Sequence, residues 1–372
     1  MSKLHRRQFI GRAPALVGGA VGLSACSDGN NGTDGDGYAA VAQRTWRLGA
    51  LNGFAGPTLG QELVRYATLA PSSHNTQCWR FAVTNTGIAI LPDWTRRTPA
   101  VDPDDHHLFV SLGCAAENLV QAALAHGLAG EVRVDTATDA VRITLAPTAA
   151  RATPLFRAIA ERQCTRGDFD GQPLSVDDIR LLERAGTSSS VRLLLLTERP
   201  AVERVLDYVV QGNTAQMADA AFVKELKSWI RFNGSDAVRT ADGLFSVASG
   251  NPSLPAWLGD LAFNFLFTTK SENEKYALQI RSSAGIAVFV GQGADKASWV
   301  DVGRCYERFA LQATALGIRN AFLNQPVEVP AVRSPFAAAM GLAGQRPDLV
   351  VRFGRGPTLP RSLRRPVQAV LV

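Results

Sequence analysis

The chain has 372 residues, of which 46% are hydrophobic and 19% are charged, and its formal net charge is +6. This length and composition are ordinary for a globular protein with a large core, and they exclude a chain that is disordered throughout. Residues 1–26 hold four basic residues and no acidic one, so the rest of the chain carries only about +2. The basic character therefore gives little support to nucleic-acid binding, and no nucleic-acid partner is expected.

The first 26 residues are predicted to be a targeting segment. A twin-arginine stretch, "RRQFIG" (6–11), precedes an apolar run over 15–25, which is shorter than the ~20 residues needed to cross a bilayer. The run ends in "LSAC" (23–26), which is similar to a lipobox and predicts a lipid anchor at Cys26. The alternative is ordinary cleavage near Ala25. Either way we expect export by the twin-arginine machinery, to the periplasm or as a membrane-anchored lipoprotein.

Residues 27–54 are predicted to be a flexible tether, because "SDGNNGTDGDG" (27–37) has the composition of a linker. The four cysteines after Cys26 form no CxxC pair, and their apolar surroundings fit buried thiols at least as well as disulfides. Metal binding has little support, since the side chains of neighbouring residues such as His106 and His107 rarely converge on one ion.

The sequence contains an internal repeat. Residues 112–128 and 302–318 align without a gap at an offset of 190, with identities that include Gly113 with Gly303 and Glu117 with Glu307. Both segments are predicted to be amphipathic helices that start near one glycine and end at another. The alternative is two unrelated alanine-rich helices.

A serine-bearing loop and an apolar strand precede each predicted helix: "APSSHNTQCWRFAV" (70–83) and "AGTSSSVRLLLLT" (185–197). Loop and helix are 41 residues apart in the first copy and 115 in the second, which predicts two halves, 55–150 and 151–372, with an insertion at about 210–273 in the second. This inserted segment either packs on the core or forms a lid over a planar ligand. Its aromatic residues are Trp229, Phe232, Trp257, Phe263, Phe265 and Phe267.

A second candidate motif is "ERQCTRGDFDGQPL" (161–174). Arg162 and Arg166 flank Cys164 at a spacing that lets two guanidinium groups clasp one dianion such as phosphate. The alternative is a solvated basic end of a helix.

The loop "APSSHNTQCWRF" (70–81) resembles the P-S-S-x-N-x-Q-P-W loop of the nitroreductase family, and "RQCTR" (162–166) resembles that family's R-x-S/T-x-R phosphate motif. The likeness covers roughly residues 55–372. In that family FMN lies at a dimer interface, and each half of this chain carries only one of the two motifs. The pattern, with "RRP" (364–366) near the end, resembles the Acg-type branch, in which two nitroreductase halves are fused.

The resemblance implies an α+β, nitroreductase-like fold of two fused homologous halves, an intramolecular pseudo-dimer with a lid insertion and one FMN. It places Arg162, Cys164 and Arg166 at the FMN phosphate and ribityl chain, with Cys164 in place of a hydroxyl residue. Arg364 and Arg365 are possible further phosphate contacts. His74, the ionisable residue of the loop, is expected to face solvent or the lid rather than to donate a proton. The residues expected at the flavin ring edge are Pro71, Ser72, Ser73 and Asn75.

The function implied is hydride transfer through flavin N5 to nitroaromatic or quinone-like acceptors, with no side chain as an acid or base catalyst. The electron donor stays open, because NAD(P)H is cytoplasmic and the protein is expected to be exported. One alternative is a non-catalytic FMN-binding or sequestering envelope protein, and another is a scaffold whose flavin site has decayed. No G-x-G-x-x-G or G-x-S-x-G motif supports a Rossmann or acyl-transfer site. A monomer is expected, because fusion replaces the homodimer.

Overall fold

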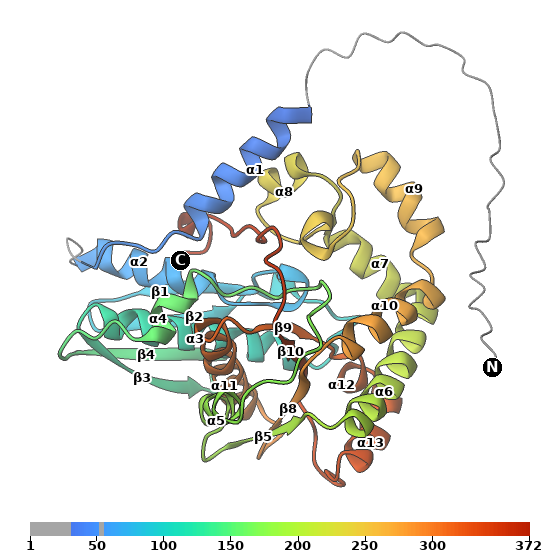
Figure 1. The fold of residues 1–372 in the computed structure, drawn as a ribbon. Coiled ribbons are helices and arrows are strands. Elements are labelled where there is room, and N and C mark those ends of the chain that lie inside the picture. The colour runs from blue at the N-terminus through green and yellow to red at the C-terminus, as the bar shows by residue number, and fades with distance from the viewer. Residues whose placement is uncertain (1–30, 52–55) are drawn as a thin grey trace, which may run out of the picture.

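The computed structural model describes residues 31–51 and 56–372 (Figure 1). The predicted targeting segment, with its twin-arginine stretch and Cys26, lies outside the described residues. Helices pack around two four-stranded sheets in which every paired strand is antiparallel. The α+β class expected from the sequence is confirmed.

The two sheets have the same topology. When the strands of each sheet are numbered by their order in the sequence, they lie side by side in the order first, second, fourth, third. The first sheet comprises β1 (Trp79–Val83), β2 (Gly87–Pro92), β3 (Leu128–Asp135) and β4 (Ala140–Pro147). The second comprises β5 (Val191–Leu196), β8 (Gly285–Gly291), β9 (Arg319–Phe322) and β10 (Leu349–Gly354). A separate pair, β6 (Ile230–Arg231) and β7 (Leu244–Phe245), is parallel.

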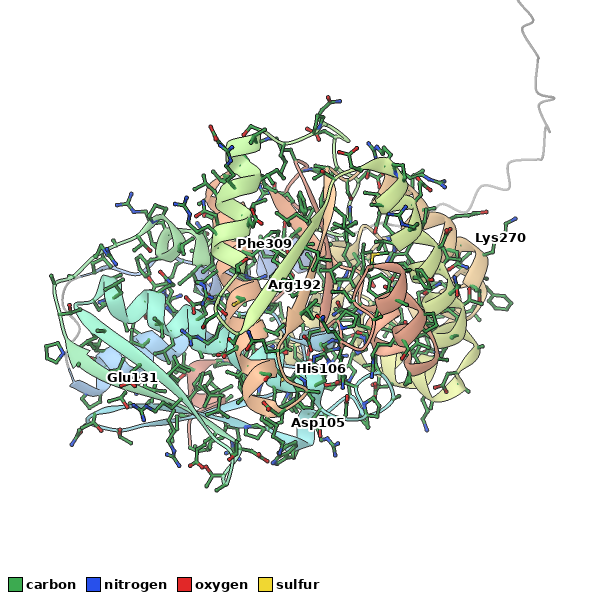
Figure 2. All side chains as sticks on the ribbon, turned by 90° about the horizontal axis from the view of Figure 1, so that it is seen from below. Asp105, His106, Glu131, Arg192, Lys270 and Phe309 are labelled. Atoms are coloured by element: carbon green, nitrogen blue, oxygen red, sulfur yellow. The ribbon has the colours of Figure 1, made fainter. Side chains whose placement is uncertain are left out.

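The faces of the sheets differ in burial. Strands β8 and β10 are buried along almost their whole length because both of their faces are covered, whereas β3 alternates between more and less exposed residues because one face meets solvent. Figure 2 shows the two sheets beside each other, with Glu131 on β3 marking the first and Arg192 on β5 marking the second.

Most helices pack against the two sheets, and a smaller group of helices lies above the sheets in Figure 1. Helices α7, α8 and α9 of the inserted segment stand with α1 in that upper group. The helices are α1 (Asn31–Thr45), α2 (Gly56–Thr68), α3 (His106–Ala125), α4 (Pro154–Ile159), α5 (Val176–Gly186), α6 (Arg199–Ala218), α7 (Ala220–Trp229), α8 (Gly234–Thr240), α9 (Ala256–Leu266), α10 (Thr269–Arg281), α11 (Lys296–Ala315), α12 (Gln325–Glu328) and α13 (Pro330–Ala339).

The two repeat helices, α3 and α11, cross in the core through their glycines. A Cβ atom added at Gly113 would lie 2.1 Å from the backbone oxygen of Val300, and one added at Gly303 would lie 2.0 Å from that of Val110. Both positions therefore need glycine. The two contacts are related by the 190-residue offset of the repeat, and reciprocal contacts of this kind are what a twofold axis produces. They support the prediction of two homologous halves, as does the shared strand order.

The helix boundaries correct one expectation. The repeat helices begin at His106 and Lys296, so Gly113 and Gly303 lie inside them rather than at their starts. The reason is the close crossing just described, which places glycine in mid-helix. The predicted ends are confirmed, since Gly127 and Gly317 follow the helices with φ of 79° and 70°. Helix α3 is long and apolar enough to cross a membrane, but 83% of that stretch is buried, which makes it a core helix.

The flexible tether predicted for 27–54 is wrong over Asn31–Thr45, which form α1. Tyr38 of α1 packs on Phe245 of the inserted segment, with ring centroids 4.5 Å apart. Trp46 is buried and donates its indole N–H to the backbone oxygen of Ser362 at 2.9 Å. The polar stretch that suggested a tether precedes two aromatic residues, and their burial outweighs its linker composition.

Of the two states that the sequence left open for the cysteines, buried thiols and disulfides, the structure shows thiols. Cys78, Cys114, Cys164 and Cys305 are free thiols, and all but the half-buried Cys164 are buried. Burial raises the pKa of the Cys78 thiol to about 12, so it stays protonated at neutral pH.

Candidate functional site

The described residues enclose a cavity of about 370 Å³ between the two halves and the inserted segment. This volume lies in the range of small-molecule and cofactor sites. We call residues 71–77 the serine loop; its Pro71, Ser72 and Ser73 form one wall of the cavity. The inserted segment forms the facing wall, whose apolar side chains include Phe222, Ile230, Phe232, Leu244, Phe263 and Phe267.

The serine loop has a strained backbone. His74, Asn75 and Gln77 have φ of 47°, 53° and 55°, a left-handed region that costs residues other than glycine about 1–2 kcal/mol each. Ala241 of the inserted segment has φ of 53° and accepts a hydrogen bond from the Gln77 side chain at 2.8 Å. Four of the six non-glycine residues with positive φ in the described part of the chain thus meet here. Such strain clusters at binding and active sites.

Asn75 holds the loop in this conformation. Its side-chain NH₂ donates to the backbone oxygens of Gly243 (3.0 Å) and Leu363 (3.2 Å), and its side-chain oxygen accepts from Arg364 (2.9 Å). Its backbone oxygen accepts from the N–H of Gly243 (3.2 Å). Asn75 therefore joins the serine loop to the inserted segment and to the C-terminal segment. It does not line the cavity, and its contact with a flavin ring stays a prediction.

The two serines are oriented towards the cavity rather than into the core. The Ser72 hydroxyl accepts from the backbone N–H of Gln77 at 2.9 Å, which leaves its own hydrogen available to donate. Ser73 is half-buried, and its backbone oxygen accepts from Thr76. Pro71, Ser72 and Ser73 line the cavity, and their contact with a flavin ring stays a prediction.

His74 also lines the cavity, under the inserted segment. Burial, together with the positive charge of Arg166, lowers the pKa of His74 to about 4, so the imidazole is neutral at neutral pH. Its Nδ1 is buried and has no hydrogen-bond partner among the described residues. An unsatisfied buried nitrogen in a cavity wall is costly unless a ligand or water completes it.

Arg166 is the member of the arginine motif that reaches the cavity. Within the described chain, its guanidinium has one hydrogen bond, to the Ser249 hydroxyl at 3.5 Å, and no carboxylate within 4.0 Å. Arg352, buried in β10, donates to the backbone oxygens of Thr165 (3.0 Å) and Gly167 (2.7 Å) and so fixes the loop on both sides of Arg166. The backbone is held while the cation stays free for an anion.

Arg162 lies elsewhere. It is 2% exposed, and its Nε lies 3.2 Å from the carboxylate of Glu307 on α11. Its Nη2 donates to the backbone oxygen of Leu69 at 2.7 Å. Burial raises the pKa of Glu307 to about 7, against the opposing effect of Arg162. Arg162 is thus engaged in a buried ion pair beneath the serine loop and does not line the cavity.

Arg364 is likewise turned to the protein. It is buried and donates to the backbone oxygens of Thr68 (2.8 Å), Leu69 (3.2 Å) and Ala70 (3.0 Å), where α2 ends. Burial lowers its pKa to about 9. Arg364 therefore caps the C-terminal end of α2 and, through its hydrogen bond to Asn75, stabilises the serine loop that follows.

The remaining predicted residues lie outside the cavity lining as well. Cys164 pairs with Asn320 of β9 through a parallel backbone bridge and is half-buried. Arg365 donates to the backbone oxygen of Ala369 at 2.8 Å and lies 3.7 Å from the carboxylate of Asp93. The structure therefore brings Pro71, Ser72, Ser73 and Arg166 together at one cavity. The predicted residues away from that lining are Asn75, Arg162, Cys164, Arg364 and Arg365.

The opposite end of the cavity is polar and connects to a buried network. Glu328 and His107 line it, with the His107 Nδ1 3.6 Å from the Glu328 carboxylate. Burial raises the pKa of Glu328. Behind them, His106 Nε2 lies 2.9 Å from Asp348, whose pKa burial raises to about 6. This end offers groups that can hold a proton.

The same network contains three residues with metal-ligand spacing. Ligand atoms of Asp102, His106 and His107 lie within 4.8 Å of one another. Both oxygens of Asp102, however, accept backbone N–H groups, from His107 (3.0 Å) and Leu108 (2.9 Å), at the start of α3. These residues thus serve the helix end and the neighbouring acids.

Several residues around the cavity were not found from the sequence. Arg352 and Ser249 belong to no motif, and their positions depend on tertiary packing. Glu328 had a usable signal: polar residues in "NQPVE" (324–328) directly follow the short strand β9. Two further cavity residues had no signal, Asn213 of α6 and Tyr276 of α10, whose pKa burial raises to about 12.

No family model matches the sequence. The chain is similar to proteins named "Putative NAD(P)H nitroreductase" in two strains of Mycobacterium tuberculosis, each 26% identical over 317 residues, 82% of this chain and 88% of the relative.

Solved structures with a detectable likeness include an FMN-dependent nitroreductase of Mycobacterium smegmatis in complex with NADPH (15% identity, TM-score 0.36, 55% of this chain and 87% of that one). Another is a nitroreductase with bound FMN from Desulfitobacterium hafniense (16% identity, TM-score 0.37, 57% and 95%). The curated relatives, which span most of this chain, support the resemblance to the nitroreductase family that its two motifs suggested.

Proposed function

We propose that this protein is an FMN-dependent oxidoreductase of the nitroreductase type, acting on flat nitroaromatic or quinone-like acceptors. One observation carries the proposal: the serine loop and Arg166, which belong to two motifs far apart in the sequence, line the same cavity. The similarity to proteins named as NAD(P)H nitroreductases supports it.

The donor set of the cavity fits FMN. Arg166, with its weak bond to Ser249 and no acidic partner within the described residues, supplies the charge that a phosphate needs. The hydroxyls of Ser72 and Ser73 and the unsatisfied Nδ1 of His74 supply polar contacts for the edge of a flavin ring. Bound FMN would supply hydride transfer from a reduced donor to the acceptor; a quinone that takes up a hydride and one proton becomes a hydroquinone.

The residues of the chain would bind, orient and desolvate. The apolar wall of the inserted segment, including Phe232 and Phe263, excludes water and offers faces for a flat acceptor. Glu328, which lines the cavity and whose pKa is raised by burial, can hold the proton that the acceptor needs. This role for Glu328 differs from the expectation drawn from the sequence, in which no side chain acts as an acid or base catalyst.

A second candidate, a protein that binds FMN without turning it over, has one observation in its favour. The inserted segment is bonded to the first half at several points: Gly243 with Asn75, Ala241 with Gln77, and the carboxylate of Glu225 with the backbone N–H groups of Ala100 (3.0 Å) and Val101 (3.1 Å). A cover held this firmly would keep a donor and an acceptor from the flavin.

The proposal extends to organisation and location. The reciprocal glycine crossing supports fused homologous halves that act as a pseudo-dimer within one chain, and hence a monomer. We further propose export by the twin-arginine route and anchoring at Cys26. The electron donor at that location would then be a reductant other than cytoplasmic NAD(P)H, or the reaction would precede export.

The test is anaerobic reduction of the FMN-loaded protein, from residue 27 onward, by NADPH or dithionite. For an oxidoreductase, we expect the flavin to bleach with either reductant and to recover its colour on addition of a quinone or nitroaromatic. Bleaching by dithionite without reoxidation by these acceptors would contradict the enzyme and favour the flavin-holding alternative.

A further inference from the structure

Helix α9 is apolar on two opposite faces. Trp257, Leu261 and Phe265 recur every four residues and so share one face of the helix. The opposite face carries Gly259 and Phe263, which are buried and line the cavity. A helix that covers a cavity needs to be apolar only on the face towards the cavity, so this role does not explain the apolar face that carries Trp257.

The outer face of α9 is open to solvent. Trp257 and Phe265 are each 71% exposed, Leu266 at the end of the helix is 73% exposed, and Leu261 is 48% exposed. Large apolar side chains gathered in this way on one face of a helix form a patch of the kind that marks an interaction surface. We call Trp257, Leu261 and Phe265 the outer stripe; Leu266 lies beside it at the end of the helix.

The charges around the outer stripe do not oppose contact with lipid headgroups. Asp260, the one charged residue of α9, is neutralised by Lys227 at 2.7 Å. Lys270 follows the stripe at the start of α10, is 86% exposed and lies 3.9 Å from the carboxylate of Glu274, and it is at the margin of the molecule in Figure 2. A tryptophan and a phenylalanine beside a lysine are typical of helices that lie in a membrane interface.

The N-terminal end of the described chain lies on the same side as α9. In Figure 1 the first residues of α1 and all of α9 lie at the top of the molecule, opposite α5. Cys26, the predicted lipid anchor, is five residues before Asn31, a separation of at most about 18 Å for an extended chain. An anchor at Cys26 would therefore hold a bilayer close to this side.

We propose that the outer stripe of α9 docks on the surface of a lipid bilayer. Leu266, at the C-terminal end of α9, is 73% exposed and also lines the cavity, so the rim of the cavity lies at the end of the helix that carries the stripe. A ligand dissolved in the bilayer would then enter without crossing water. On the proposed function, this selects acceptors that partition into lipid, such as quinones with an alkyl tail.

The experiment is flotation of the purified protein, from residue 27 onward, with vesicles of phosphatidylcholine and phosphatidylglycerol. This protein lacks the anchor but keeps every described residue. We expect it to float, and the double substitution Trp257→Lys, Phe265→Lys to weaken binding at least tenfold. The matched control is Val176→Lys on α5, a position 66% exposed on the opposite side, which should bind as the parent does.

A second readout locates the contact. Vesicles with brominated lipids should quench tryptophan fluorescence of the parent, and Trp257→Phe, which keeps the stripe apolar, should still float but lose most of that quenching. Failure of the parent to float, equal binding by the double variant, or association of the chain with itself through this face in place of vesicles would overturn the proposal. None of these readouts involves FMN, so they can fail while the proposed function stands, and the reverse.

Discussion

The serine loop (71–77) and the loop over 187–190 occupy equivalent positions, each before the first strand of its sheet. In both, a backbone oxygen just before the loop accepts a hydrogen bond from an arginine that is paired with a glutamate. Leu69, before the serine loop, accepts from Arg162, which is paired with Glu307. Ala185, before the other loop, accepts from Arg308 at 3.2 Å, which is paired with Glu117 at 3.1 Å. Glu117 and Glu307 are themselves positions of the internal repeat.

The two loops differ in what lies above them. The serine loop is covered by the inserted segment and the C-terminal segment and is strained at three residues. Ser188 and Ser189 of the other loop are exposed, and Ser188 bonds to its neighbours Ser190 and Val191. The repeated framework is therefore not sufficient to form the site. The inserted segment and the C-terminal segment, which together cover the serine loop, are also needed, because they hold its strained backbone and the inserted segment supplies the facing wall of the cavity.

The largest effect tests the shared support. Arg162→Ala should lower the free energy of unfolding by about 3–5 kcal/mol, because it leaves Glu307 buried without its partner. Arg308→Ala should cost less, about 1 kcal/mol, because this arginine is 22% exposed and Glu117 keeps a second partner, Arg304, at 3.3 Å. Urea denaturation measures both. Equal losses would show that the two supports do not differ as their burial indicates.

The next effect separates support from ligand binding. Arg166→Ala should weaken FMN binding by about 10- to 150-fold, since a charged hydrogen bond contributes about 1.5–3 kcal/mol, with little change in the free energy of unfolding of the FMN-free protein. Quenching of flavin fluorescence on titration gives the affinity. Arg192→Ala, on the exposed side of β5, is the control. Unchanged FMN affinity in Arg166→Ala would remove the phosphate assignment.

A smaller effect tests the cover. Gly243 has φ of +74°, and a Cβ atom there would lie 2.4 Å from the backbone oxygen of Trp229, so Gly243→Ala should shift the inserted segment off Asn75 and cost about 2 kcal/mol. Gly250 has a similar φ of +79° but no atom within 4 Å of its added Cβ, so Gly250→Ala reports the cost of backbone strain alone. Thermal unfolding compares them. If both variants lose the same stability, contact with the cover does not matter.

The smallest effect concerns pH. The pKa of His74 is lowered from 6.5 to about 4 in the folded protein, so the unfolded chain binds more protons between these values. This residue therefore makes the free energy of unfolding decrease as pH falls from about 6.5 to 4. His74→Asn, which tolerates positive φ, should flatten that decrease in urea titrations at several pH values. A variant with the same pH dependence as the parent would mean that His74 is not desolvated.

Much of the repeated arrangement of helices and strands could be predicted from the sequence, because hydrophobic periodicity and the spacing of glycines indicate these elements locally. The sequence predicts the two repeat helices, the strand after each serine-bearing loop and the inserted segment. The helix starts were wrong because Gly113 and Gly303 serve a close crossing, which depends on the partner helix. The tether was wrong because the burial of Tyr38 and Trp46 depends on distant residues.

The site could be predicted only in part. The motifs indicate which segments converge, and Ser72, Ser73 and Arg166 do meet at the cavity. The motifs do not indicate which of two nearby arginines points inwards: Arg162 meets Glu307 in the core, whereas Arg166 stays free because Arg352 holds its backbone. That division is set by contacts with α11 and β10, which no local pattern contains.

The visible absorption spectrum of the purified protein, with the cofactor identified after denaturation, tests the central claim most directly. The account predicts a yellow protein that releases FMN in near-equal amount to the chain, or that binds FMN in that ratio when it is added. A colourless protein that cannot be loaded with FMN would contradict the assignment of the cavity between the serine loop and the inserted segment.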